Sequence, residues 1–193
     1  MQFISFIASY ELPYQKYADL GWVFAEKRLG PQEPRLFASR QYSEPLEIAH
    51  PEFQLSLGEG WRRFPDDDPE RFAFHSASRK TSVVLSVAMH PVVSRDRLLG
   101  IANKLAEVRV QAEQDARPDS MVKVTSCNVE LKDDGHLGFV VYAGYDERAI
   151  FRFMGWVTQR KVLSLWVSTE TRDNEYSKAM FGEVFAGLRF HLP

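Results

Sequence analysis

The sequence predicts a single α+β domain in which helices flank an antiparallel meander of β-strands. Short segments rich in β-branched and aromatic residues, bounded by turn residues, recur between residues 53 and 169. Two further segments, 94–118 and 173–188, carry apolar residues at helical spacing. With 193 residues, 45% of them hydrophobic, the chain can bury one core without disulfides. We expect one compact domain with an N-terminal extension (residues 1–51) and a core (residues 52–193).

The N-terminal extension predicts a strand, a helix and a proline-rich connection. Residues 3–7 are strand-like, and Pro13 suits the first position of a helix over residues 14–29. Residues 21–24 would also suit a strand, so both interpretations stay open. The prolines that follow interrupt the chain and leave short strands at residues 36–41 and 46–49.

The core is predicted to open with strands. Phe53, Leu55 and Leu57 alternate with polar residues, and Gly58-Glu59-Gly60 turns the chain into a strand at residues 61–64. Strands at residues 71–76 and 81–90 follow. The second of these is apolar at nearly every position, which predicts a central strand that is covered on both faces.

Residues 94–118 predict the clearest helix of the chain. The Ser94 hydroxyl suits an N-cap that accepts a backbone N–H bond, and Asp96 favours the positive end of the helix. Arg117-Pro118 ends the segment. Its apolar residues share one face and predict a half-buried helix: Leu98, Ile101, Ala102, Leu105, Val108 and Ala112.

The remaining residues predict a meander and a final helix. Strands at residues 122–131 and 137–146 are joined by the turn Lys132-Asp133-Asp134-Gly135, which is typical of a hairpin. Two more strands follow at residues 148–159 and 161–169. Asp173 or Asn174 then caps the last helix, and residues 189–192 form a short extended tail.

Charge, apolar runs and cysteine content argue against several classes of protein. The chain has 24 Lys and Arg against 26 Asp and Glu, so it lacks the basic excess of a nucleic-acid-binding protein. No apolar run approaches the roughly 18–20 residues of a membrane span. The N-terminus has no positive charge ahead of its apolar residues, so we expect a cytoplasmic protein. Cys127 is the single cysteine, and its strand-like surroundings predict a buried, inert thiol.

No catalytic or metal-binding motif stands out. The histidines are scattered without a His-x-x-x-His pair: His50, His75, His90, His136 and His191. Gly58-Glu59-Gly60 lacks the third glycine and the lysine of phosphate-binding loops. The acidic run Asp66, Asp67, Asp68 and Glu70 lacks the glycine and the later glutamate of a calcium loop and predicts a solvated turn. We therefore expect no catalytic residue, no metal and no cofactor.

Aromatic residues on the late strands supply the candidate binding surface. Alternation places Met154 on the face of Trp156, and we expect Trp156 and Trp166 to share an exposed, mixed sheet face. Aromatic side chains bury a large area at low entropic cost. Trp156, Trp166, Met154 and Tyr142 are therefore the predicted partner-binding residues. The alternative is that such residues pack beneath the helices.

From residue 52 onward the predicted order is three strands, a long helix, four strands and a helix. This order resembles the PsbP-like fold, an α/β/α sandwich, and within it the bacterial DcrB-like group. The resemblance is carried by Phe53-Gln54-Leu55-Ser56-Leu57-Gly58-Glu59-Gly60-Trp61, by Ser94-Arg95-Asp96-Arg97-Leu98 after a strand, by Asp133-Asp134-Gly135 and by Gly187-Leu188-Arg189-Phe190. It implies a non-enzymatic binding module. Among cytoplasmic members of the group, it implies a chaperone that holds apolar segments of type VI secretion effectors.

The leading hypothesis is a non-enzymatic cytoplasmic binding or adaptor protein whose partner is an effector or toxin segment. One alternative is an immunity-type inhibitor that docks its acidic loop, residues 66–68, on a basic toxin. Another is an enzyme with an unrecognised pocket that uses His136, His75 or Cys127. A homodimer is a further hypothesis, because a sheet with an uncovered face or edge can pair with a second copy.

Overall fold

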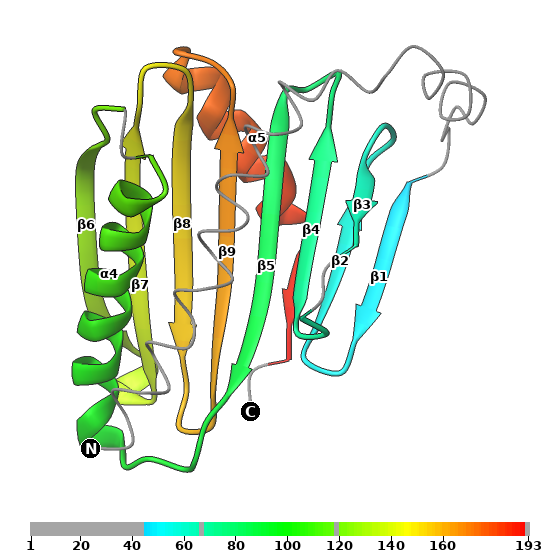
Figure 1. The fold of residues 1–193 in the computed structure, drawn as a ribbon. Coiled ribbons are helices and arrows are strands. Elements are labelled where there is room, and N and C mark those ends of the chain that lie inside the picture. Colours follow the sequence, from blue (N-terminus) through cyan, green and yellow to red (C-terminus); the bar gives the residue numbers. More distant parts are fainter. Residues whose placement is uncertain (1–44, 66–67, 118–119, 192–193) are drawn as a thin grey trace.

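A computed structural model describes residues 45–65, 68–117 and 120–191. These residues form two antiparallel β-sheets, and a long helix lies on each side of the larger sheet (Figure 1). The predicted α+β class is therefore confirmed. The strand predicted at residues 3–7, the helix at 14–29 and the strand at 36–41 lie outside the described residues.

The smaller sheet joins distant parts of the chain. It consists of β1 (Leu46–His50), β2 (Phe53–Leu57) and β10 (Leu188–Phe190), with β2 in the middle. Phe53, Leu55 and Leu57 are buried while the residues between them are exposed, as the alternation predicts. Because His50 pairs with Phe53 in the β1–β2 hairpin, the boundary predicted at Glu52 falls within the hairpin turn.

The larger sheet has the strand order β3-β4-β5-β9-β8-β7-β6. Its strands are β3 (Arg62–Phe64), β4 (Arg71–Ser76), β5 (Thr81–Met89), β6 (Lys123–Lys132), β7 (Leu137–Tyr145), β8 (Ile150–Val157) and β9 (Lys161–Thr169). β5 lies between β4 and β9 and most of its residues are buried, which confirms the predicted central position. β6 forms an edge of the sheet, because the chain crosses over after β5 and returns strand by strand.

Helix α4 (Leu98–Asp115) covers the β6–β8 half of one face of the larger sheet (Figure 1). Its predicted apolar face is buried, apart from a half-buried Ile101. The predicted N-cap at Ser94 is wrong, because a 3-10 turn, η1 (Arg95–Arg97), separates this serine from α4 and its hydroxyl caps no backbone N–H. A hydrogen bond from Ser94 instead lowers the pKa of the exposed Asp96 carboxyl.

Helix α5 (Asn174–Ala186) lies on the opposite face of the larger sheet, behind β9 in Figure 1. Its predicted cap at Asp173 is confirmed, because this carboxylate accepts the backbone N–H bonds of Glu175 at 2.9 Å and Tyr176 at 3.1 Å. The larger sheet thus separates two apolar cores. The core beside α5 and the smaller sheet includes Phe53, Phe74, Leu85, Leu165 and Val184. The core beneath α4 includes Leu98, Leu105, Val140, Phe151 and Phe153.

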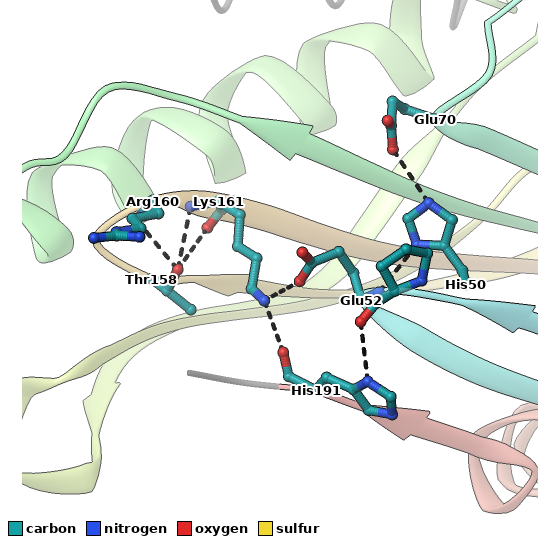
Figure 2. A network of polar contacts seen from close by, with 8 residues as sticks. His50, Glu52, Glu70, Thr158, Arg160, Lys161 and His191 are labelled. Atoms are coloured by element: carbon teal, nitrogen blue, oxygen red, sulfur yellow. Dashed lines mark hydrogen bonds and ion pairs between the residues drawn. The ribbon is translucent and has the colours of Figure 1, made fainter.

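A polar network ties the smaller sheet to the larger one (Figure 2). The Lys161 ammonium, at the start of β9, pairs with the Glu52 carboxylate and donates a hydrogen bond of 2.7 Å to the His191 carbonyl. The His191 ring lies 3.0 Å from the Pro51 carbonyl oxygen, which closes the network around the β1–β2 turn. Because the Lys161 side chain is only 8% exposed, these partners replace the water that its ammonium group loses on folding.

Candidate functional site

The four predicted partner-binding residues do not form one surface. Tyr142 and Trp166 belong to the face beneath α4, whereas Met154 and Trp156 belong to the face beside α5. Cross-strand pairing fixes this division, because Trp166 lies opposite Phe153 and Trp156 lies opposite Leu163. Three of the four are buried, and Met154 is half-buried. The predicted exposed face shared by Trp156 and Trp166 is therefore wrong.

Trp156 is a packing residue under α5. Its ring lies 4.1 Å from that of Phe190 and stacks with Phe185 at 6.3 Å, measured between ring centroids. Phe139 of β7 contacts it from the sheet side at 6.0 Å. This aromatic cluster fixes the C-terminal helix and strand on the sheet.

Trp166 and Tyr142 instead meet at a buried carboxylate. The indole of Trp166 donates a hydrogen bond of 2.7 Å to Oε1 of Glu113, and the Tyr142 hydroxyl donates one of 2.9 Å to the same atom. Oε2 of Glu113 accepts a bond of 2.7 Å from Arg117, one helical turn later. Glu113 is fully buried, and these three donors compensate for the loss of water around its charge.

The ion pair continues from the helix to the β7–β8 turn. Nε of Arg117 lies 2.9 Å from Oδ2 of Asp146, and Oδ1 of Asp146 accepts the backbone N–H bonds of Arg148 and Ala149, each at 2.7 Å. Sequence reasoning did not single out Glu113 or Arg117. The sequence pattern that could have identified them is Arg109-x-x-x-Glu113-x-x-x-Arg117. This spacing places a positive, a negative and a positive side chain on one face of a helix. The side chains of Glu113, Arg117 and Asp146 are all buried, so this network stabilises the fold and is not accessible to a ligand.

The part of the larger sheet that residues 45–65, 68–117 and 120–191 leave open lies beside α5, over β6, β7 and β8. Three cross-strand rows run along it: Ser126–Ala143–Arg152–Val167, Asn128–Val141–Met154–Leu165 and Glu130–Phe139–Trp156–Leu163. Within each row, exposure falls toward β9, because α5 packs on β8 and β9 on this face of the larger sheet. We define the open face as the residues left at least partly exposed on these rows: Ser126, Asn128, Glu130, Phe139, Val141, Ala143, Arg152 and Met154.

α5 forms a wall beside the open face. Phe181 and Phe185, one turn apart on this helix, stack at 6.3 Å, and Phe185 is among the exposed large apolar side chains. Lys178 stands one turn before Phe181 on the same side of the helix. The wall therefore carries a lysine toward the N-terminus of α5 and two phenylalanines toward its C-terminus.

A pocket of about 610 Å³ marks the cationic end of the open face. Its polar and charged lining includes Thr125, Ser126, Arg152, Arg172, Asn174 and Lys178, and its apolar lining includes Ala143, Ala149 and Ile150. A volume of this size suits a small ligand or the end of a peptide. Burial lowers the pKa of the Arg152 guanidinium, while the nearby Glu175 carboxylate acts in the opposite direction.

The residues proposed for an enzyme lie apart. His75 is on β4, where its Nδ1 lies 3.0 Å from the Ser82 hydroxyl, and Cys127 is on the edge strand β6. His136 is exposed at the β6–β7 turn. The prediction of a buried Cys127 is wrong, because an edge strand is covered less than a central one. Partial burial still raises the pKa of the thiol, in keeping with an unreactive group.

The remaining features weighed from the sequence are the metal ligands, the acidic loop and the apolar runs. Among residues 45–65, 68–117 and 120–191, no three His, Cys, Asp or Glu side chains converge to hold a metal ion. Of the acidic loop, Asp66 and Asp67 lie outside the described residues, and the Glu70 carboxylate lies 3.6 Å from His50. Within the same ranges, neither α4 nor α5 has the length and apolar character needed to cross a bilayer.

Comparison with solved structures shows the fold. The chain is similar to cyanobacterial PsbP (CyanoP) from Synechocystis sp. PCC 6803, with a TM-score of 0.56 and 13% identity over 77% of this chain and 94% of that one. A protein from Bacteroides thetaiotaomicron VPI-5482 aligns with a TM-score of 0.43 and 12% identity over 78% of this chain and 49% of the other. No family model matches the sequence, and no curated protein matches it either. The chain has a PsbP-like fold.

Proposed function

We propose that this protein is a non-enzymatic binding or adaptor protein whose open face holds an apolar segment of a protein partner. The observation that carries the proposal is the row Asn128–Val141–Met154, where apolar side chains of two strands stay partly exposed beside the aromatic wall of α5. An extended or helical segment laid there would bury Val141, Met154 and Phe185 together. The separation of His75, Cys127 and His136 supports a binding role over catalysis.

Within this class, we propose a cytoplasmic chaperone for a type VI secretion effector. The resemblance of residues 52–193 to the DcrB-like group supports this narrower role. An apolar effector segment needs cover before export, and a sheet face walled by a helix can supply it. The partner is then the effector encoded beside this protein.

The test is co-purification of the neighbouring effector with the full chain and its variants. Val141→Asp and Met154→Asp each place a charge where the client would exclude water, so we expect recovery to fall by about tenfold or more. Val92→Asp is the matched control, because Val92 is 66% exposed and lies outside the open face. Full recovery with both open-face variants would contradict the proposal.

The salt dependence of partner binding distinguishes this role from that of an immunity-type inhibitor. An apolar client should be recovered equally at low and high ionic strength, because apolar contacts are not screened. A basic toxin held by the acidic loop should be lost as salt rises. A steep loss with salt, unaffected by Val141→Asp, would favour the inhibitor.

A further inference from the structure

The pocket at the cationic end of the open face contains two arginines that are bonded only to neutral oxygens among the described contacts. Nη2 of Arg152 donates to the Asn174 side-chain oxygen at 2.6 Å. Arg172 donates from Nε and Nη2 to the Glu147 carbonyl at 2.9 Å and 2.6 Å. Both guanidinium groups are therefore positioned by neutral acceptors and not by a carboxylate in these hydrogen bonds.

The acidic groups near the pocket leave this charge largely uncompensated. Asp146, the single carboxylate among the lining residues, has a side chain only 1% exposed, and it is taken up by Arg117 and two backbone N–H groups. Glu175 pairs with Lys178 at 2.7 Å, and both of these side chains are exposed. Glu175 also acts on Arg152 electrostatically, although no ion pair joins them in the described residues.

Arg152 has hydrogen-bonding capacity left over. Its Nε is buried and has no hydrogen-bond partner among the described residues. A guanidinium carries five N–H donors in a planar fork that matches a carboxylate in two-point contact. An anion in the pocket would offer acceptors to the guanidinium group of Arg152, which lines it.

The apolar part of the lining restricts which anion fits. Ala143 and Ile150 line the pocket, and Val141 and Met154 continue the same face away from it. A small inorganic anion would use only the charged end. We propose that the pocket binds a carboxylate attached to an apolar chain, with the carboxylate on Arg152 and the chain along Val141 and Met154. This inference rests on the proposed binding role of the open face and specifies the end of the segment held there.

The experiment measures binding of two carboxylate probes and their uncharged partners by NMR titration of the full chain. The first pair is the peptide acetyl-Leu-Val-Leu-Leu with a free terminal carboxylate and the same peptide with a terminal amide. The second pair is decanoate and decanol. We expect each acid to bind about tenfold more tightly than its neutral partner and to shift the Arg152 Nε–H and Gly144 amide signals.

Substitutions of Arg152 test whether the tighter binding of the acids arises in the pocket. Arg152→Gln should reduce the preference for the acid to about twofold or less, and Arg152→Lys should keep part of it. Arg62→Gln is the matched control, because Arg62 is exposed on β3 at the opposite edge of the sheet. Thermal unfolding of each variant checks that the fold is intact.

The outcomes distinguish failure of the carboxylate site from failure of the open face. Equal binding of acid and neutral probes, binding of neither, or an acid preference that survives in Arg152→Gln overturns the carboxylate site. If decanoate alone shows the preference, the carboxylate site stands and the pocket takes a fatty acid, which contradicts the proposed protein client. If Val141→Asp lowers effector recovery while the acid preference is absent, the open face stands and the carboxylate site fails.

Discussion

The indole of Trp166 donates its hydrogen bond to Glu113, a residue 53 positions earlier in the chain, over 2.7 Å. This contact joins the last turns of α4 to β9 in the middle of the larger sheet. Arg117 and Asp146 extend it to the β7–β8 turn. The buried network around Glu113 thus fixes the position of a helix against two strands of the sheet and the β7–β8 turn.

Replacing Glu113 should therefore destabilise the protein strongly. Glu113→Ala removes the acceptor shared by Trp166, Tyr142 and Arg117, and we expect the free energy of unfolding to fall by about 3 kcal/mol. Urea unfolding followed by fluorescence measures the change. Glu107→Ala on the same helix is the control, because its 68% exposed side chain pairs only with Lys104, and its loss should cost less than about 1 kcal/mol. A Glu113→Ala cost no greater than that of Glu107→Ala would rule out this role.

Lys161 should act as the polar link between the two sheets. Lys161→Met keeps the apolar stem but leaves the Glu52 carboxylate without its cation, and we expect a loss of about 1–3 kcal/mol. A double-mutant cycle with Glu52→Gln isolates the pair, and its coupling energy should exceed about 0.5 kcal/mol. Additive effects of the two substitutions would show that the pair contributes no coupling.

Gly187 should tolerate no side chain. A Cβ at this position would lie 2.0 Å from the Ser56 carbonyl oxygen, because β2 passes directly over the end of α5. We expect Gly187→Ala to lower the free energy of unfolding by about 2–3 kcal/mol. Gly182 lies inside α5, and a Cβ added there would meet no atom within 4 Å, so Gly182→Ala should instead stabilise by about 0.5–1 kcal/mol. Thermal unfolding of the two variants should shift in opposite directions, and a shift in the same direction would contradict the close approach at Gly187.

His75 should make stability depend on pH. Burial lowers the pKa of its imidazole below the ordinary value of 6.5, with Glu170 opposing the shift. The unfolded chain then binds the proton more readily, so the stability contributed by neutral His75 is present above pH 6.5 and is lost as the pH falls through 6.5 toward the lower folded value. His75→Gln should flatten the fall in unfolding free energy over this range. An unchanged pH profile of the unfolding free energy in His75→Gln would contradict the assignment.

The elements that the sequence predicted well are those whose pattern is local. The continuous apolar run in residues 82–89 depends only on which residues are adjacent, and it correctly indicated a central strand. Asp173 as a helix cap depends on bonds within the next three residues. The turn at Asp133-Asp134-Gly135 is likewise local, and all three residues adopt positive φ in the hairpin.

The site depended on pairing between strands, which no local pattern contains. Alternation tells which residues of one strand share a face, but the faces of two strands are related only through their register. Trp156 and Trp166 fell on opposite faces for this reason. Cys127 was expected to be buried because its neighbours are strand-like, but the crossover through α4 placed β6 at the edge of the sheet.

By itself, the sequence determined the α+β class, the bounds of most elements and the lack of a local catalytic motif, since these depend on composition and short-range spacing. Only the tertiary structure decided which residues face a ligand. The open face exists because α5 packs on β8 and β9 and leaves Val141 and Met154 partly uncovered. The pocket exists because β8, the β9–α5 loop and the first turns of α5 bring Arg152, Arg172 and Lys178 together. Both depend on long-range packing, whose geometry is set by the whole core.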